Sequence, residues 1–132
     1  MNKISVELKP EIKTYDIDIA GHVNNIVYIK WFEDLRTELF NNYFNLQDLI
    51  SNNLYPVVVS TNIIYKKYLT LFDKPVGIMS IECLKHSIIT LKIQIKLEEK
   101  IAAFGEQKCV LMNLKTGKME KEKLKILQIQ NV

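Results

Sequence analysis

The segment from Tyr15 to Trp31 holds the side chains of this chain that are best suited to chemistry. Two acids, Asp16 and Asp18, stand two residues apart, and His22 follows four positions after the second. A carboxylate serves as a general base or as a nucleophile, and an imidazole moves protons near neutral pH. The spacing therefore places a base and a proton-handling group in one short stretch.

Asn24 and Asn25 follow after Val23 and open a stretch with helical periodicity, for which either residue is a suitable N-cap. Amide groups at a helix start lack partners within the helix and lie at the positive end of its dipole. They can therefore stabilise an oxyanion that forms on an attacked acyl carbonyl. The backbone of Asn24 and Asn25 matters more for this role than their side chains.

Each of these residues also has a purely structural explanation. Asp16 is expected to hold the loop through Asx-type hydrogen bonds. Asp18 is either functional or a capping carboxylate, and His22 either assists catalysis or packs in the loop. A metal site made of all three has no evident fourth ligand and ranks lowest.

Hydrophobic periodicity predicts the elements that must position this segment. From Asn24 to about Tyr43, apolar residues cover a helical arc too wide for one neighbouring helix, so a curved sheet is expected against it. Asn41 and Asn42 are expected to end this helix, and Leu46–Ser51 is expected to form a short helical turn. Alternation predicts strands over 4–13, 57–68, 76–84, 89–97 and 101–114.

Pro10 is expected to make the middle of the first strand an edge or a bulge, and Pro56 is expected to mark the entry to the second strand. One face of the second strand should carry Val57, Val59, Thr61, Ile63 and Tyr65. Residues 119–127 are either a short helix or a last edge strand. Because one helix precedes a run of strands, we expect an α+β fold over 1–132, with five or six antiparallel strands connected as a meander around one central helix.

Composition narrows the function classes. The 132 residues suggest one domain, with 48% hydrophobic and 25% charged residues as in an ordinary globular protein. The net charge of +3 is too mild for a nucleic-acid binder. Since no apolar run reaches ~18 residues and no signal-peptide core is visible, we expect no membrane span and a cytoplasmic location. Cys83 and Cys109 are expected to be buried, reduced thiols.

The order of strand, Asp-x-Asp-x-x-Gly-His-Val-Asn-Asn, long helix and antiparallel strands resembles the hotdog-fold thioesterases. Its nearest branches are the 4-hydroxybenzoyl-CoA thioesterase-like acyl-CoA hydrolases and the acyl-ACP thioesterases. The resemblance spans the whole layout and is most specific over 16–38. A weaker match covers 64–73.

The resemblance implies hydrolysis of an acyl thioester of coenzyme A or acyl carrier protein, without a cofactor. The catalytic carboxylate of the family maps onto Asp18, and the histidine that assists in acyl-ACP thioesterases maps onto His22. Those enzymes carry an asparagine where this chain has Ala20, and hydroxybenzoyl-type enzymes carry an apolar residue at the position of His22. We take Asp18, His22 and the Asn25 amide as the catalytic candidates.

Six residues are candidates for substrate binding, each with a structural alternative as helix cap, core aromatic, strand residue or solvated lysine: Asn24, Tyr28, Ser60, Thr61, Lys66 and Lys67. Tyr28 would border the acyl group, and the lysines would meet the coenzyme A phosphates. The resemblance further implies a homodimer or homotetramer with active sites between subunits. Hydrolysis of acyl-CoA is the leading hypothesis; the alternatives are an acyl-ACP thioesterase and a non-catalytic acyl- or CoA-binding protein.

Overall fold

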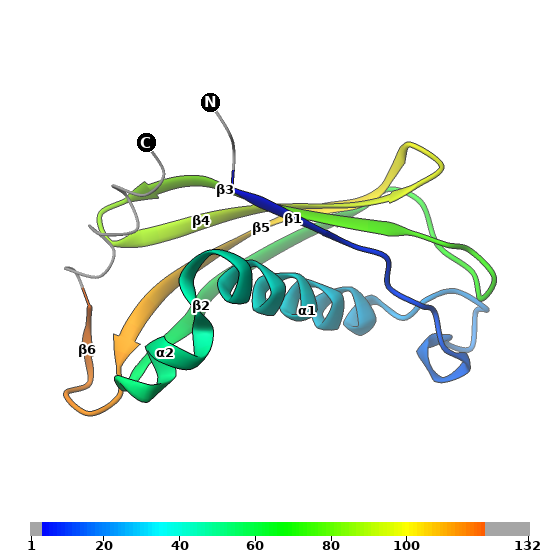
Figure 1. Ribbon diagram of the computed structural model, residues 1–132. Coiled ribbons are helices and arrows are strands. Elements are labelled where there is room, and N and C mark those ends of the chain that lie inside the picture. Colours follow the sequence, from blue (N-terminus) through cyan, green and yellow to red (C-terminus); the bar gives the residue numbers. More distant parts are fainter. Residues whose placement is uncertain (1–3, 121–132) are drawn as a thin grey trace.

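The computed structural model describes residues 4–120, in which an antiparallel sheet curls around one long helix (Figure 1). The helices are α1 (Asn25–Phe44) and α2 (Leu46–Ser51), with a 3-10 turn at Thr14–Asp16. The six strands are β1 (Ser5–Leu8), β2 (Leu54–Tyr65), β3 (Val76–Lys85), β4 (Ile88–Leu97), β5 (Lys100–Asn113) and β6 (Lys118–Met119). The predicted α+β hotdog architecture is confirmed.

The wide apolar arc of α1 is buried against the sheet, as expected. Its buried side chains are Val27, Tyr28, Trp31, Phe32, Leu35, Leu39 and Phe40. Asn24 is the N-cap, with its side chain accepting a hydrogen bond from the Ile26 N–H at 3.0 Å. The prediction that Asn41 and Asn42 end the helix is wrong. The end comes at Phe44 because Asn45 adopts φ 52°, a left-handed conformation that asparagine tolerates better than most residues.

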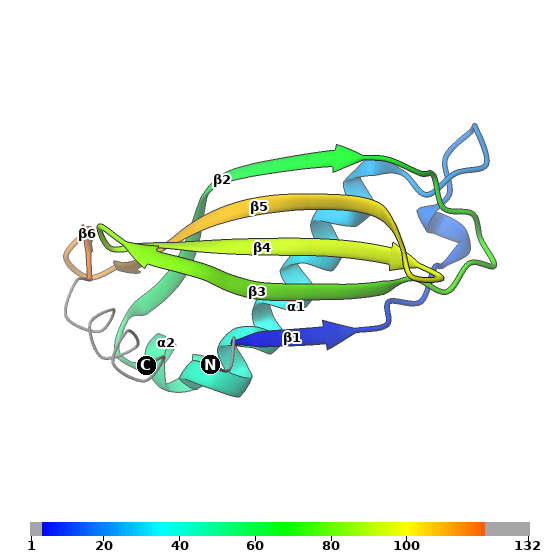
Figure 2. The same cartoon turned by 90° about the horizontal axis from the view of Figure 1, so that it is seen from above.

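The sheet order is β1-β3-β4-β5-β2, with β6 paired to β5 (Figure 2). The expected meander is right for β3, β4 and β5 but wrong for β2, which crosses to the far edge and pairs with β5. Both edges of the sheet are thus formed by strands that precede the meander in the chain. The edge at β2 is long, whereas β1 has only 4 residues.

Both edge strands have different bounds from those predicted. The first ends at Leu8, ahead of Pro10, rather than running to residue 13. The second begins at Leu54 and ends at Tyr65, so Pro56 lies inside it, opposite Leu111. An edge strand accommodates proline because half of its N–H groups need no partner in the sheet.

A bulge in β2 lies between Val58 and Ser60. Before it, Val58 stands opposite the buried Cys109; after it, Thr61 stands opposite the buried Gln107. The prediction that Val57 and Val59 share a face with Thr61 is therefore wrong. The extra residue resets the alternation, so that Thr61, Ile63 and Tyr65 follow Val58 on the side of the sheet that faces α1.

Strand β4 shows the alternation that the sequence predicts. Its helix-facing side chains are at most 7% exposed: Ile89, Leu91, Ile93, Ile95 and Leu97. The turn after it places Glu98 and Glu99 at positive φ, as two-residue hairpins of type I′ require. The sequence therefore predicted both the buried face and the end of this strand.

Gly105 lies where the backbones of β5 and β2 and the ring of Phe32 meet. A Cβ atom there would stand 2.4 Å from the Asn62 carbonyl oxygen and 3.1 Å from Phe32. We expect Gly105→Ala to lower the free energy of unfolding by about 1–3 kcal/mol, because overpacking displaces backbone or ring. Urea denaturation would measure this, with Glu106→Ala on the exposed face as the control. Equal stability of the two variants would contradict the close-approach explanation.

The remaining features concern the tail, the cysteines and the helices. Within the uncertain stretch 119–127, Met119 belongs to β6, and residues beyond 120 lie outside the described part.

Cys109 is buried, and burial raises the pKa of its thiol to about 11. Cys83 is exposed, against the prediction, and neither thiol is in a disulfide. Neither helix in residues 4–120 has the length and apolar character needed to cross a bilayer.

Candidate active site

The loop between the 3-10 turn and α1 is a small hairpin closed by an antiparallel bridge between Ile17 and Val23. Inside the bridge, the Asp18 N–H donates to the His22 carbonyl oxygen at 2.9 Å. The Gly21 N–H donates to the Asp18 carbonyl oxygen at 3.0 Å, with Gly21 at φ +82°. The glycine permits this tight turn, which holds Asp18 directly opposite His22.

The carboxylate of Asp18 is oriented by its own loop. Its Oδ1 atom accepts hydrogen bonds from the Ala20 N–H at 2.9 Å and the His22 N–H at 3.4 Å. For Oδ2, no donor is found in the described part of the chain, and the side chain is exposed. One oxygen is thus anchored while the other stays open to solvent or to a ligand.

Asp16 has a different environment. It is 6% exposed, and its Oδ2 atom accepts a hydrogen bond from the Lys13 N–H at 2.8 Å. Its carbonyl oxygen accepts another from the Asn24 N–H at 2.8 Å. Asp16 therefore ties the loop to the start of α1, in the manner expected from the sequence.

The imidazole of His22 stacks on the phenol ring of Tyr68, with centroids 3.8 Å apart and planes 8° from parallel. The next residue, Val23, donates its N–H to the Leu69 carbonyl oxygen at 2.8 Å. These contacts fasten the hairpin to the segment that follows β2. The ring of His22 makes no hydrogen bond within residues 4–120, and no metal-ligand cluster is found there.

The start of α1 presents one unpaired amide. The Ile26 N–H is taken by the Asn24 side chain, and the Val27 N–H donates to the Asn24 carbonyl oxygen at 2.9 Å. The Asn25 N–H has no acceptor among the residues that the structure describes. It is therefore available as an oxyanion donor at the positive end of a 20-residue helix.

Two tyrosines support this helix start. The Tyr65 hydroxyl donates to the Asn25 carbonyl oxygen at 3.3 Å, and the rings of Tyr28 and Tyr65 meet edge to face at 5.1 Å. Tyr28 is 2% exposed. Burial, followed by the nearby Tyr65 and Asp73, raises the pKa of Tyr28 to about 12, so its hydroxyl stays protonated.

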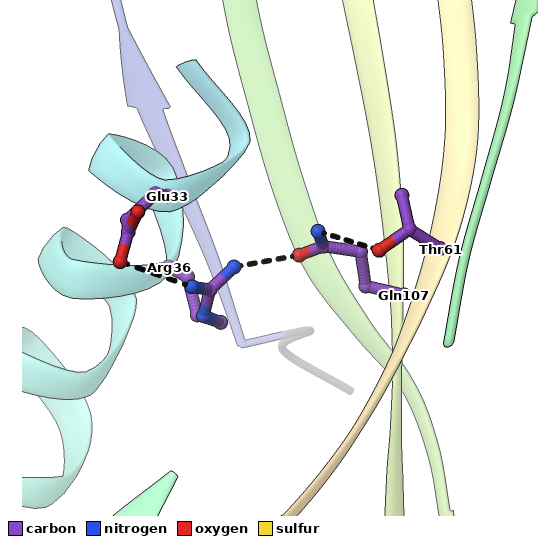
Figure 3. Close-up of polar contacts among 4 residues, drawn as sticks. All are labelled: Glu33, Arg36, Thr61 and Gln107. Atoms are coloured by element: carbon purple, nitrogen blue, oxygen red, sulfur yellow. Dashed lines mark hydrogen bonds and ion pairs between the residues drawn. The ribbon is translucent and has the colours of Figure 1, made fainter. Parts of the chain in front are cut away.

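Arg36, Gln107 and Thr61 form a polar chain from α1 across the sheet to its edge (Figure 3). The Arg36 Nη1 atom donates to Gln107 Oε1 at 2.8 Å, and Gln107 Nε2 donates to Thr61 Oγ1 at 3.2 Å. Glu33 lies 3.5 Å from Arg36 Nη2. The helix flank and the strand edge are thus linked at a point away from the helix start.

The six predicted binding residues do not all lie together. Thr61 lies on the face of β2 that faces α1, and Tyr28 is buried near the start of α1. Asn24 uses its side chain as a cap, and Ser60 stands on the other face of β2. Lys66 and Lys67 follow the end of β2, and the ammonium of Lys66 lies 5.9 Å from the Phe104 ring centroid.

Gln107 and Tyr68 were not among the predicted site residues. The sequence could have indicated Gln107, because it is a polar residue at an inward position of its strand, between Gly105 and Cys109. Tyr68 lies within the weaker match over 64–73, but no role could be assigned to it because its ring contact with His22 joins residues that are distant in sequence.

A hollow of about 630 Å³ adjoins the loop between residues 9–15 and 71–75. Three lysines line it: Lys9, Lys13 and Lys74. The exposed ring of Phe72 lies at its border. Two acids, Glu11 and Asp73, line it as well, and Glu11 lies 3.1 Å from the Lys13 ammonium. This surface therefore combines charges of both signs with an aromatic ring close to the candidate catalytic loop.

The sequence is similar to thioesterases, both to a family model and to a characterised protein. Residues 12–129 match the model of the thioesterase-like superfamily. The long-chain acyl-CoA thioesterase FadM of Escherichia coli (strain K12) is 28% identical over 110 residues, which cover 82% of this chain and 83% of FadM.

Solved structures share the fold. The probable thioesterase YbaW from Escherichia coli superposes with a TM-score of 0.79 at 26% identity, covering 98% of both chains. The DHNA-CoA thioesterase from Staphylococcus aureus has a TM-score of 0.81 at 20% identity, covering 99% of this chain and 94% of that one. The second of these supports the fold alone.

Proposed function

The chain belongs to the thioesterase-like superfamily, and on that premise we propose that it hydrolyses an acyl-CoA thioester to a free acid and coenzyme A. The observation that carries this proposal is the open oxygen of Asp18 in the loop that leads into the unpaired Asn25 N–H. These are a base or nucleophile and an oxyanion donor, the two groups that thioester hydrolysis needs.

In the proposed reaction, the Asp18 carboxylate either deprotonates a water molecule or attacks the thioester carbonyl itself. The carbonyl oxygen gains negative charge and accepts a hydrogen bond from the Asn25 N–H. The carbon–sulfur bond then breaks, and the coenzyme A thiolate leaves and takes up a proton, from Asp18 in the general-base route and from solvent in the nucleophilic route. If Asp18 attacks directly, water must afterwards cleave the resulting anhydride. Both routes proceed without a cofactor, since coenzyme A is part of the substrate.

We propose that His22 is a positioning residue, because its ring stacks on Tyr68 instead of bonding to Asp18. His22→Phe should then keep kcat/KM within about threefold of the parent value, whereas His22→Ala should lower it about tenfold through loss of the stack. Steady-state hydrolysis by the two variants would measure this. If Phe and Ala both cost about 10²–10⁴-fold, His22 transfers protons instead.

We further propose that the enzyme is a homodimer formed through β2. This strand is 12 residues long and, among residues 4–120, pairs on one side only, with β5. Val59 and Tyr65 on it are 57% and 41% exposed, and Ile29 on the adjacent flank of α1 is 47% exposed. A long, apolar strand edge with unpaired N–H and C=O groups tends to pair with another chain, and a second copy of this protein would cover it.

The acyl chain of the substrate would lie along what we call the α1–β2 strip. The strip consists of Asn25, Ile29 and Arg36 from the helix and Thr61, Ile63 and Tyr65 from the strand. It begins at the proposed oxyanion donor, and it is bounded on its open side by the proposed partner. The carrier would extend toward the exposed cations of Lys66 and Lys67.

A hydrolysis panel tests the proposal. Acyl-CoAs of increasing chain length and an aromatic acyl-CoA would be compared with the same acyl groups on acyl carrier protein. Faster turnover of the CoA esters is expected; faster turnover of the protein-bound esters would assign the carrier as acyl carrier protein. Tight binding of all of them without turnover would overturn the proposed activity.

We also propose a cytoplasmic location, because both cysteines are free thiols and the cytoplasm keeps thiols reduced.

A further inference from the structure

The polar chain of Arg36, Gln107 and Thr61 lies at the far end of the α1–β2 strip, and its hydrogen bonds can run in only one direction, from Arg36 to Thr61. Arginine can only donate, so the Gln107 oxygen must face Arg36 and the Gln107 amide nitrogen must face Thr61. The Thr61 oxygen then accepts, and its one hydroxyl proton is left for another partner. No acceptor for that proton is found in residues 4–120.

Burial makes this orientation rigid. Gln107 is 2% exposed and the Arg36 side chain 15%, so reversing the amide would leave two donors facing each other away from water. Thr61, in contrast, is exposed at the sheet edge. The polar chain therefore begins at a partly buried charge and ends at the surface in one hydroxyl whose proton is free to be donated.

The hydroxyl lies at the opposite end of the strip from the proposed oxyanion donor. Tyr65 contacts Asn25, and Thr61 is four residues before it on the same face, a span of about 13 Å along a strand. On the helix, Arg36 is eleven residues after Asn25, an advance of about 16 Å. Half-buried Ile63 and exposed Ile29 lie between these ends, so the middle of the strip is apolar.

We infer that Thr61 is a specificity-determining residue, which selects acyl chains carrying a neutral oxygen acceptor at the end remote from the thioester. This inference rests on the proposed thioesterase function. A hydroxyl or keto oxygen at that distance would accept the Thr61 proton. A plain alkyl end would cover the hydroxyl without giving it an acceptor, and a site built to hydrogen-bond a substrate discriminates against such analogues.

The charge balance favours a neutral oxygen over a carboxylate. Glu33 lies 3.5 Å from Arg36 and offsets its charge, and Gln107 separates Arg36 from Thr61. An anionic acyl end would have to approach the strip near Glu33, whose side chain is 70% exposed. The donor that remains is therefore a hydroxyl that Gln107 separates from a compensated ion pair.

The test compares octanoyl-, decanoyl- and dodecanoyl-CoA with their ω-hydroxy counterparts and with an ω-carboxy series. For the unmutated protein, we expect kcat/KM for the best ω-hydroxy acyl-CoA to be on the order of tenfold above that for the unsubstituted acyl-CoA of the same length. This is the effect of one neutral hydrogen bond. Thr61→Val should bring that ratio to about one, and Thr61→Ser should retain it. Thr37→Val, on the exposed face of α1, is the matched control and should leave the ratio unchanged.

A merely structural Thr61 would change the rates of both substrates together and leave their ratio as it was, which would overturn the inference. Parent protein that hydrolyses plain and hydroxylated chains equally would also overturn it, while the proposed thioesterase function would stand. A preference for ω-carboxy chains would assign recognition to Arg36 instead of Thr61. Absence of hydrolysis for all of these substrates would overturn the proposed function itself.

Discussion

Asp18→Asn should abolish most of the hydrolysis of acyl-CoA, lowering kcat by about 10²–10⁴-fold with little effect on folding. The amide oxygen of asparagine can still accept hydrogen bonds from the Ala20 and His22 N–H groups that orient Asp18. What the variant loses is the basic, negatively charged oxygen. Thioester hydrolysis followed by release of the free thiol would measure the loss.

Asp34→Asn is a matched control for this variant, since it neutralises an exposed acid on α1 that the proposed reaction does not use. Its rate should equal that of the parent chain. Unfolding curves of both variants should overlay that of the parent within about 0.5 kcal/mol, as for surface substitutions. Full activity of Asp18→Asn would refute the role of Asp18 as base or nucleophile.

Val59→Lys should separate the proposed dimer and lower hydrolysis by about 10²-fold, because loss of one wall of the site misplaces the acyl group. Val59 lies in the bulge of β2 and is 57% exposed. A lysine there would place like charges from two copies close together, and charged edges resist pairing. Size-exclusion chromatography with light scattering would measure the mass in solution.

The control for the interface is Ser5→Lys, which adds the same charge to the other edge strand, β1. It should leave both mass and activity as they are. A monomeric Val59→Lys with full activity would show that one chain holds the complete site. A Val59→Lys variant that stays dimeric and active would place the interface elsewhere.

Much of the fold could be predicted because it depends on local periodicity. The structure confirms the apolar arc of α1, the alternation of β4 and an N-cap at one of the two residues expected, Asn24 or Asn25, because all three are properties of neighbouring residues. Errors appear where an end or a face depends on one backbone conformation. Asn45 ends the helix by adopting a left-handed φ, and the bulge at Val58 and Ser60 reverses a face of β2.

The sequence by itself determined the elements, the family resemblance and the loop that bears Asp18, since these depend on residue types at short spacing. Only the tertiary structure decided that β2 lies beside β5, because strand pairing joins residues far apart in the chain. That pairing brings Thr61 to Gln107, and packing of α1 brings Gln107 to Arg36. Orientation of the Thr61 hydroxyl needs all three, so no local pattern could have shown it.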